Sequence, residues 1–347
     1  MKVERSKKLV QIAIRTAVTL LISILLVVVA GGNPIQAVSS FFYGLFGTLN
    51  GFAEIFVRAT PLILLGLAVA LSFKTGFFNL GADGQFYIGA IAATITVLYT
   101  PGLPGLVRIC LAFFASFAAG GFWAFLPAWM KNSLGISETV STIMFNYIAI
   151  MLVGIFIRGF LQDLNTTEAM SSQIPEEARL TQLFYPTRLH SGIIIAVLAA
   201  FVIWFVLYRT TFGLNMKLIG MSKRAAYCNG LPVKRWLAIS AIISGGLAGL
   251  AGMIEILGLQ YRLLEGVSSG NGYTAVLIAL LASNNPLGII GVAIGYAMLM
   301  VGTTTMQRHL GIPSSMVSII IGFIVMMVLS KDLMKYLKEH KKVKAEK

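Results

Sequence analysis

Polar side chains interrupt long apolar runs at two places, and they are the residues of this chain best suited to contact a polar solute. The first break, 75–85, reads TGFFNLGADGQ and carries Asn79, Asp83 and Gln85. If its apolar flanks cross a membrane, backbone this irregular is tolerated only where protein buries it or a watery cavity adjoins it. The first break is therefore a candidate lining of a translocation path, with a polar turn as the alternative.

The second break, 260–271, has the same layout. It contains Ser268 and Asn271 among glycines, follows a long apolar run and precedes a stretch led by Tyr273, as the first break precedes Phe86. Paired breaks in two halves of a transporter point to a central site between structural repeats. Only the glycines and the two aromatic residues correspond, so the sequence alone does not establish a repeat.

Glu255 lies near the end of the apolar run 236–259. Ionisable residues inside membrane spans usually face the interior of the bundle or a watery cavity. Contact with a ligand is the functional interpretation of Glu255, and polar packing between helices is the plain one.

Several classes of chemistry are excluded by what the sequence lacks. It has no G-x-x-x-x-G-K-[ST] phosphate loop, no H-E-x-x-H motif and no G-x-S-x-G motif, so we do not expect this chain to hydrolyse ATP or to be an enzyme. Cys110 and Cys228 are far apart in sequence and the three histidines are isolated, so no metal site is expected.

The elements that position these residues are apolar helices. The chain has 347 residues, of which 57% are hydrophobic and 12% charged, whereas soluble domains average roughly 45–50% and about 25%. Several runs reach the roughly 17–25 residues that a helix needs to cross a bilayer. We expect an all-α, polytopic membrane bundle of about ten spans: 12–30, 52–73, 85–99, 107–130, 140–157, 192–207, 236–259, 273–282, 287–303 and 313–329.

The distribution of positive charge predicts the orientation. The net charge is +14, and eighteen of the 27 Lys and Arg residues lie in 1–15, 209–235 and 331–347. Clustered positive charge marks cytoplasmic flanks, so we interpret it as a sign of orientation and not of binding to nucleic acid. We therefore expect both termini on the cytoplasmic side, which requires an even number of spans. This gives a basic N-terminus (1–11), a transmembrane domain (12–330) with an external loop (158–190) and a cytoplasmic loop (209–235), and a basic tail (331–347).

The cytoplasmic loop contains the signals of a short helix. Ser222 is a suitable N-cap, and Gly230 followed by Pro232 ends the helix. A short capped helix lying across such a loop suits docking to a partner protein, and contact with anionic lipid is the alternative.

One segment of this loop is similar to a known motif. Arg224, Ala225 and Ala226, three further residues and then Gly230 resemble the EAA-x3-G coupling loop of ABC-importer permeases, with Arg in place of the leading acid. Such a loop inserts into a cleft on the ATP-binding subunit. The resemblance implies that Ser222, Arg224, Ala225, Ala226 and Gly230 couple this chain to an ATPase.

A second resemblance covers 52–330. The stretch 66–85 (GLAVALSFKTGFFNLGADGQ) resembles the hallmark of the branched-chain amino acid, ribose and nucleoside permease family. Nucleoside-type members typically read FNIGAEGQ where this chain reads FNLGADGQ, so Asp83 stands in the place of Glu. The segments 141–148 (STIMFNYI), 255–258 (EILG) and 285–288 (NPLG) add to the similarity.

This resemblance implies a permease subunit of a nucleoside ABC importer in a bacterial plasma (inner) membrane. It implies as partners a second, homologous permease, ATP-binding subunits that hold ATP and Mg, a lipid-anchored substrate-binding protein and membrane lipid, with no cofactor or metal in this chain. Ribose hydroxyls and base edges suit amide and carboxylate side chains in a narrow cavity. The expected lining residues are Asn79, Asp83, Gln85, Asn146, Glu255 and Asn271.

Two alternatives stay open. The first is a permease of the same family for sugars or branched-chain amino acids. The second is a stand-alone, ion-coupled carrier, in which Glu255 or Asp83 would be the coupling acid.

Overall fold

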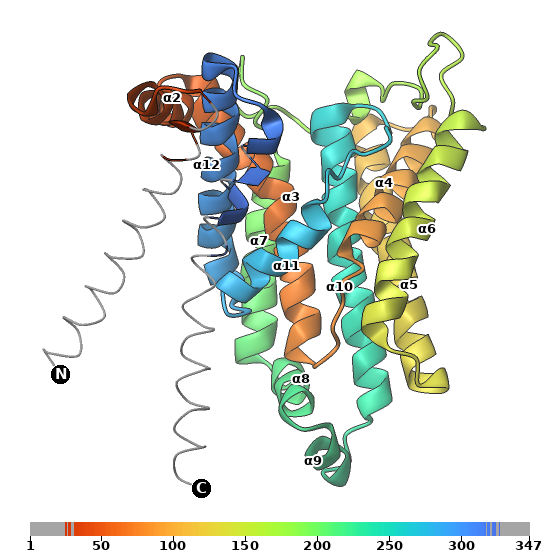
Figure 1. Cartoon of the computed structure of the whole chain (residues 1–347). Coiled ribbons are helices and arrows are strands. Elements are labelled where there is room, and N and C mark those ends of the chain that lie inside the picture. The colour runs from red at the N-terminus through yellow and green to blue at the C-terminus, as the bar shows by residue number, and fades with distance from the viewer. Residues whose placement is uncertain are drawn as a thin grey trace, which may run out of the picture. The chain divides into compact units, whose positions relative to one another are not determined.

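A computed structural model describes residues 31–316 together with 25, 27, 28, 318, 319, 321–323 and 326, and these residues form helices joined by turns and loops (Figure 1). The α-helices are α2 (Pro34–Phe46), α3 (Leu49–Lys74), α4 (Ala82–Leu98), α5 (Gly105–Leu134), α6 (Glu138–Arg158), α7 (Gly192–Arg209), α8 (Thr211–Met221), α9 (Lys223–Cys228), α10 (Val233–Glu255), α11 (Asn271–Leu281) and α12 (Pro286–Leu310). A 3₁₀ turn, η1, covers Glu176–Ala178, and a π-helix, η2, covers Ile256–Gln260. The all-helical class predicted from the sequence is confirmed for the described residues.

Six of the helices in the described part of the chain are long and apolar enough to cross a membrane: α3, α5, α6, α7, α10 with η2, and α12. The predicted spans 85–99 and 273–282 correspond to the shorter helices α4 and α11. The eleven residues of α11 rise only about 16 Å, roughly half the thickness of a bilayer core. All but three residues of the predicted span 12–30 lie outside the described residues, and the predicted span 313–329 is described only in part, so the count of ten stays a prediction.

Helix ends follow local residue signals. The Asn33 side chain accepts a hydrogen bond from the Ile35 amide at 2.9 Å, and Pro34 opens α2. Gly135 ends α5 in the left-handed region at φ 69°, where glycine has no steric penalty.

The larger of two compact units, 56–296, is built around α10, which packs against α4 and α5. Glycines bring these backbones together. A Cβ added to Gly249 would lie 2.2 Å from the Ser116 carbonyl oxygen, and one added to Gly89 would lie 2.3 Å from Gly249. These glycines therefore allow tight packing between α10 and its neighbours. Gly291 of α12 differs, because nothing lies within 4 Å of a Cβ added there among the described residues.

The smaller unit, residues 1–55 and 297–347, contains α2 and the second half of α12. Its described core consists of Val27, Ala37, Met306 and Ile312. A Cβ added to Gly44 would lie 2.4 Å from Thr305 Oγ1, so α2 and α12 pack closely within this unit.

Candidate functional site

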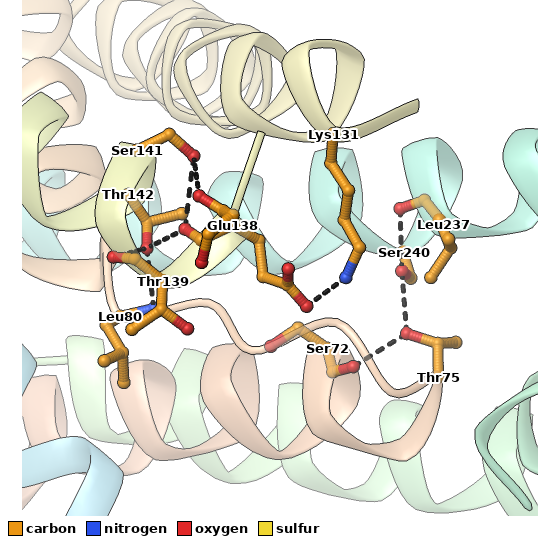
Figure 2. A network of polar contacts seen from close by, with 11 residues as sticks. Ser72, Thr75, Leu80, Lys131, Glu138, Thr139, Ser141, Thr142, Leu237 and Ser240 are labelled. Carbon is orange, nitrogen blue, oxygen red and sulfur yellow. Dashed lines mark hydrogen bonds and ion pairs between the residues drawn. The ribbon is translucent and has the colours of Figure 1, made fainter. Parts of the chain in front are cut away.

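The first break between α3 and α4 is anchored to α10 by hydroxyl groups. Thr75 Oγ1 donates to the Ser72 carbonyl at 2.7 Å and to Ser240 Oγ at 2.9 Å (Figure 2). The chain turns at Gly76, whose φ of 70° lies in the left-handed region. The break therefore leaves α3 along a path that α10 supports.

An amide pair fixes the centre of this break. Asn79 Nδ2 donates to Gln85 Oε1 at 3.0 Å, and Gln85 Nε2 donates back to Asn79 Oδ1 at 3.0 Å. Asn79 Nδ2 also donates to Ser244 Oγ at 2.9 Å, and all three residues are buried. A buried polar group must have such partners to avoid a large desolvation penalty. In this conformation, Asn79 and Gln85 hold each other and the break in place.

Asn146 joins α6 to the first break and to α11. Its Oδ1 accepts from the Gly84 amide at 2.7 Å, and its Nδ2 donates to the Leu80 carbonyl at 2.9 Å and to Tyr273 Oη at 3.2 Å. Asn146 is fully buried, whereas Tyr273 is 44% exposed. The Tyr273 ring therefore marks the accessible edge of this network.

Asp83 brings the two breaks into direct contact. Its Oδ1 accepts hydrogen bonds from Ser268 Oγ and from the Gly272 amide, the latter at 3.0 Å. Asp83 lies in the first turn of α4 and Gly272 in the first turn of α11, so this buried carboxylate is at the positive ends of two helix dipoles. A Cβ added to Gly272 would lie 2.4 Å from the Asp83 amide nitrogen, so glycine permits this approach.

The other two expected lining residues lie beside this network. Glu255 is buried at the end of α10, and its Oε1 accepts from Gln260 Nε2 at 3.1 Å across the π-helix η2. Asn271 is half-buried as the first residue of α11. Four of the six expected residues, Asn79, Asp83, Gln85 and Asn146, thus either lie in the first break or bind it by hydrogen bonds.

The segment 158–190 pairs with the second break through its backbone. The Ile174 amide donates to the Tyr261 carbonyl at 2.8 Å, and the Ser171 amide donates to the Leu263 carbonyl at 3.0 Å. The Arg179 guanidinium also lies 4.5 Å from the centroid of the Tyr261 ring. Sequence reasoning missed this pairing, because backbone hydrogen bonds between irregular segments leave no residue pattern.

Two serines that sequence reasoning missed, Ser240 and Ser244, complete the site together with Ser268 of the second break. Ser240 and Ser244 of α10 receive the first break, and Ser268 donates to Asp83. The signal for the first two was available, because residues four apart share one helix face and these two interrupt an apolar helix.

The short helix predicted in the loop 209–235 is present as α9. Ser222 Oγ accepts from the Ala225 amide at 3.2 Å, and Gly230 follows at φ 77°. Ala226 is buried, whereas Tyr227 is 75% exposed. The side chain with which α9 faces the protein, Ala226, is thus small. The outward face of α9, with Tyr227, is available to a partner.

The loop 209–235 also contacts the first break. A Cβ added to Gly220 at the end of α8 would lie 2.1 Å from the Lys74 carbonyl oxygen, and one added to Gly76 would lie 3.6 Å from Gly220 Cα. The helices α8 and α9 therefore pack directly where the first break begins.

The site contains no group of three or more potential metal ligands among the described residues. It offers amide, hydroxyl and carboxylate groups within an apolar bundle. Such an arrangement can bind a polar, uncharged solute by hydrogen bonds.

Comparison with known proteins gives a consistent result. Residues 51–329 match the protein family described as branched-chain amino acid transport system / permease component. The chain is 34% identical over 318 residues to a guanosine ABC transporter permease protein of Bacillus subtilis, covering 90% of each chain. It is 30% identical over 320 residues to a nucleoside ABC transporter permease protein of Lactococcus lactis, covering 90% of this chain and 88% of the relative. It is also 30% identical over 313 residues to a glucose ABC transporter permease protein of Haloferax volcanii, covering 87% and 82%.

Proposed function

The chain belongs to the branched-chain amino acid transport system / permease component family and is an ABC transporter permease subunit, and from this premise we propose that it carries nucleosides into the cell. In this proposal, it forms one half of the translocation path beside a second, homologous permease. Separate ATP-binding subunits supply the energy, and a lipid-anchored binding protein delivers the solute.

The hydrogen-bonded junction of the two breaks is the structural observation that supports this proposal. Ribose hydroxyls and base edges both donate and accept hydrogen bonds, as do amide side chains. We assign Asn79, Asp83, Gln85, Asn146, Glu255 and Asn271 to the solute path. Asn146 and Tyr273 are the proposed first contacts, because Tyr273 is the accessible member of the network.

Alternating access is the proposed mechanism. ATP binding closes the pair of ATP-binding subunits, and the coupling loop with Ser222, Arg224, Ala225, Ala226 and Gly230 moves with them. Because α8 packs against the start of the first break, a displacement of the loop reaches the solute path. ATP and Mg are held by the partner subunits in this mechanism.

The proposed membrane topology follows the charge pattern. The basic termini and the loop 209–235 lie on the cytoplasmic side of a bacterial plasma membrane, and the segment 158–190 lies outside. Ten spans satisfy this arrangement.

A sugar is the second candidate solute, because one relative with 30% identity is a glucose permease protein. A sugar offers the same hydroxyl groups as a nucleoside but no aromatic base. The two candidates therefore differ in whether a base is required.

Reconstitution tests the proposal. The chain is co-expressed with its partner subunits, placed in proteoliposomes and supplied with guanosine, ribose or glucose. We expect guanosine to be taken up and to stimulate ATP hydrolysis, whereas the two sugars do neither. Uptake of glucose without uptake of guanosine would replace the nucleoside proposal by the sugar one, and guanosine uptake that persists without ATP-binding subunits would refute the mechanism.

A further inference from the structure

An ion pair closes the end of the bundle near the coupling loop. Lys131 in the last turn of α5 pairs with Glu138, the first residue of α6 (Figure 2). Their side chains are only 19% and 14% exposed. Lys131 Nζ also lies 5.7 Å from the centroid of the Phe77 ring in the first break. Because the pair is shielded from water, it interacts more strongly than an exposed surface pair.

Lys223 brings the coupling helix α9 to the same place. Burial lowers the pKa of Lys223 from its ordinary value, the positive charge of Lys131 lowers it further, and Glu138 opposes the shift. The geometry agrees with these effects, since a Cβ added to Gly76 would lie 3.8 Å from the Lys223 Cε, and the Lys131 Nζ lies 5.7 Å from the centroid of the ring of the next residue, Phe77. Both lysine side chains therefore approach the start of the first break.

Hydrogen bonds connect this cluster to the site. Thr142 Oγ1 of α6 donates to the Glu138 carbonyl at 2.7 Å and accepts from the Leu80 amide at 3.3 Å (Figure 2). One turn further along α6, Asn146 contacts Leu80 and Gly84. A movement at the start of α6 is therefore transmitted to the first break through two side chains of one helix.

We propose that Lys131, Glu138 and Lys223 form a charged joint that transmits movement of α9 to the first break. Two positive groups share one carboxylate, so attraction and repulsion oppose each other within the cluster. A small displacement of Lys223 changes both the attraction to Glu138 and the repulsion from Lys131. The Lys131–Glu138 pair and the first break that it contacts then take a new position. The three are positioning residues that touch no solute, and the inference rests on the proposed function.

The test uses the assembled complex with its ATP-binding subunits and a readout that needs no solute. Cys110 and Cys228 are exposed, so both are first replaced by serine. Phe78 in the first break is 54% exposed and is changed to cysteine. The labelling rate of this cysteine by a thiol reagent is measured without nucleotide and after trapping with ATP and vanadate.

Three variants are compared in that background. Glu138→Gln removes the shared carboxylate, Lys223→Met removes the charge of Lys223 while keeping the Lys131–Glu138 pair, and Lys131→Glu with Glu138→Lys exchanges the charges. Glu265→Gln is the matched control, because it breaks the exposed Arg158–Glu265 pair, which lies outside the cluster.

We expect trapping to change the labelling rate about fivefold or more in the parent and in the Glu265→Gln control. Glu138→Gln and Lys223→Met should reduce this change to less than about twofold without altering assembly, and the charge exchange should recover it. If Glu138→Gln prevents assembly, Lys223→Met decides. A Lys223→Met complex with the parent's response would overturn the joint, as would a parent whose labelling does not respond to trapping. Guanosine uptake by the parent complex is measured separately, so failure of the nucleoside proposal is seen independently of the joint.

Discussion

Replacing Asp83 with Asn tests whether the two polar breaks stabilise each other. The buried carboxylate accepts from Ser268 Oγ and from the Gly272 amide. Hydrogen bonds to a charged group contribute about 1.5–3 kcal/mol and neutral ones about 0.5–1.5, so each bond weakens by about 1 kcal/mol when the charge is removed. Loss of the favourable charge at the N-termini of α4 and α11 adds roughly 0.3–1 kcal/mol. The expected destabilisation is therefore about 2–3 kcal/mol.

A double-mutant cycle isolates the contact between the breaks. Asp83→Asn, Ser268→Ala and the double variant are purified in detergent and unfolded with increasing SDS, with tryptophan fluorescence reporting the folded fraction. Since the two side chains share a hydrogen bond, we expect a coupling free energy of about 1 kcal/mol. Ser222→Ala is the control partner for Asp83→Asn, because its hydroxyl caps α9 instead. That pair should be additive within about 0.5 kcal/mol.

Two results would refute this reasoning. If Asp83→Asn and Ser268→Ala are additive within about 0.5 kcal/mol, the hydrogen bond does not stabilise the contact. A total loss for Asp83→Asn below about 0.5 kcal/mol would refute the estimate of the charge contribution as well.

Three further outcomes are expected. Gly249→Ala places a Cβ 2.2 Å from a carbonyl oxygen of α5 and should lower the free energy of unfolding by about 1–3 kcal/mol. Gly291→Ala, where the added Cβ meets open space, should not lower it. Thermal unfolding in detergent compares the two variants. Ser222→Ala removes the N-cap of α9 and should lower the free energy of unfolding by about 1 kcal/mol. It should also reduce guanosine-stimulated ATP hydrolysis by the complex, while ATP hydrolysis by the free ATP-binding subunits stays unchanged. Burial lowers the pKa of His190 to about 4, so the folded state binds a proton less readily than the unfolded state does. The free energy of unfolding should therefore be highest above about pH 6.5 and should fall by roughly 3 kcal/mol as the pH drops to 4. His190→Gln should flatten this part of the melting-temperature profile, and an unchanged profile would assign the acid sensitivity to other groups.

Helices whose signals are local were predictable. The expected span 107–130 lies within α5 (Gly105–Leu134), and the expected span 192–207 lies within α7 (Gly192–Arg209). An apolar run of this length has few alternatives to a helix in a bilayer, since every backbone amide needs a partner. The short helix α9 was predictable for the same local reason, because its cap and its terminating glycine lie within nine residues.

The partners of the breaks were not predictable, because they are distant in sequence. Asn79 meets Ser244 across 165 positions, and Ser268 meets Asp83 across 185. The polar residues of each break were visible in the sequence. A serine or threonine in an apolar helix, however, often bonds only to the backbone of its own helix, as Thr94 does with Ala90. The pairing of Ile174 with Tyr261 uses backbone groups alone, so no residue type could indicate it.

The hydrogen bonds that hold the two breaks together link solute recognition to opening of the path. In this conformation, Asp83 of the first break accepts hydrogen bonds from Ser268 of the second break and from the Gly272 amide, whereas Asn79 and Gln85 pair with each other within the first break. Separating the breaks leaves Asp83 without these two donors, at a cost of about 1–3 kcal/mol for each buried group left without a partner. On the proposed function, a nucleoside replaces the lost partners with its hydroxyls and base edges and thereby lowers the cost of opening. An apolar solute of the same size supplies none of these bonds, so the same side chains select a polar solute and keep the path closed when that solute is absent.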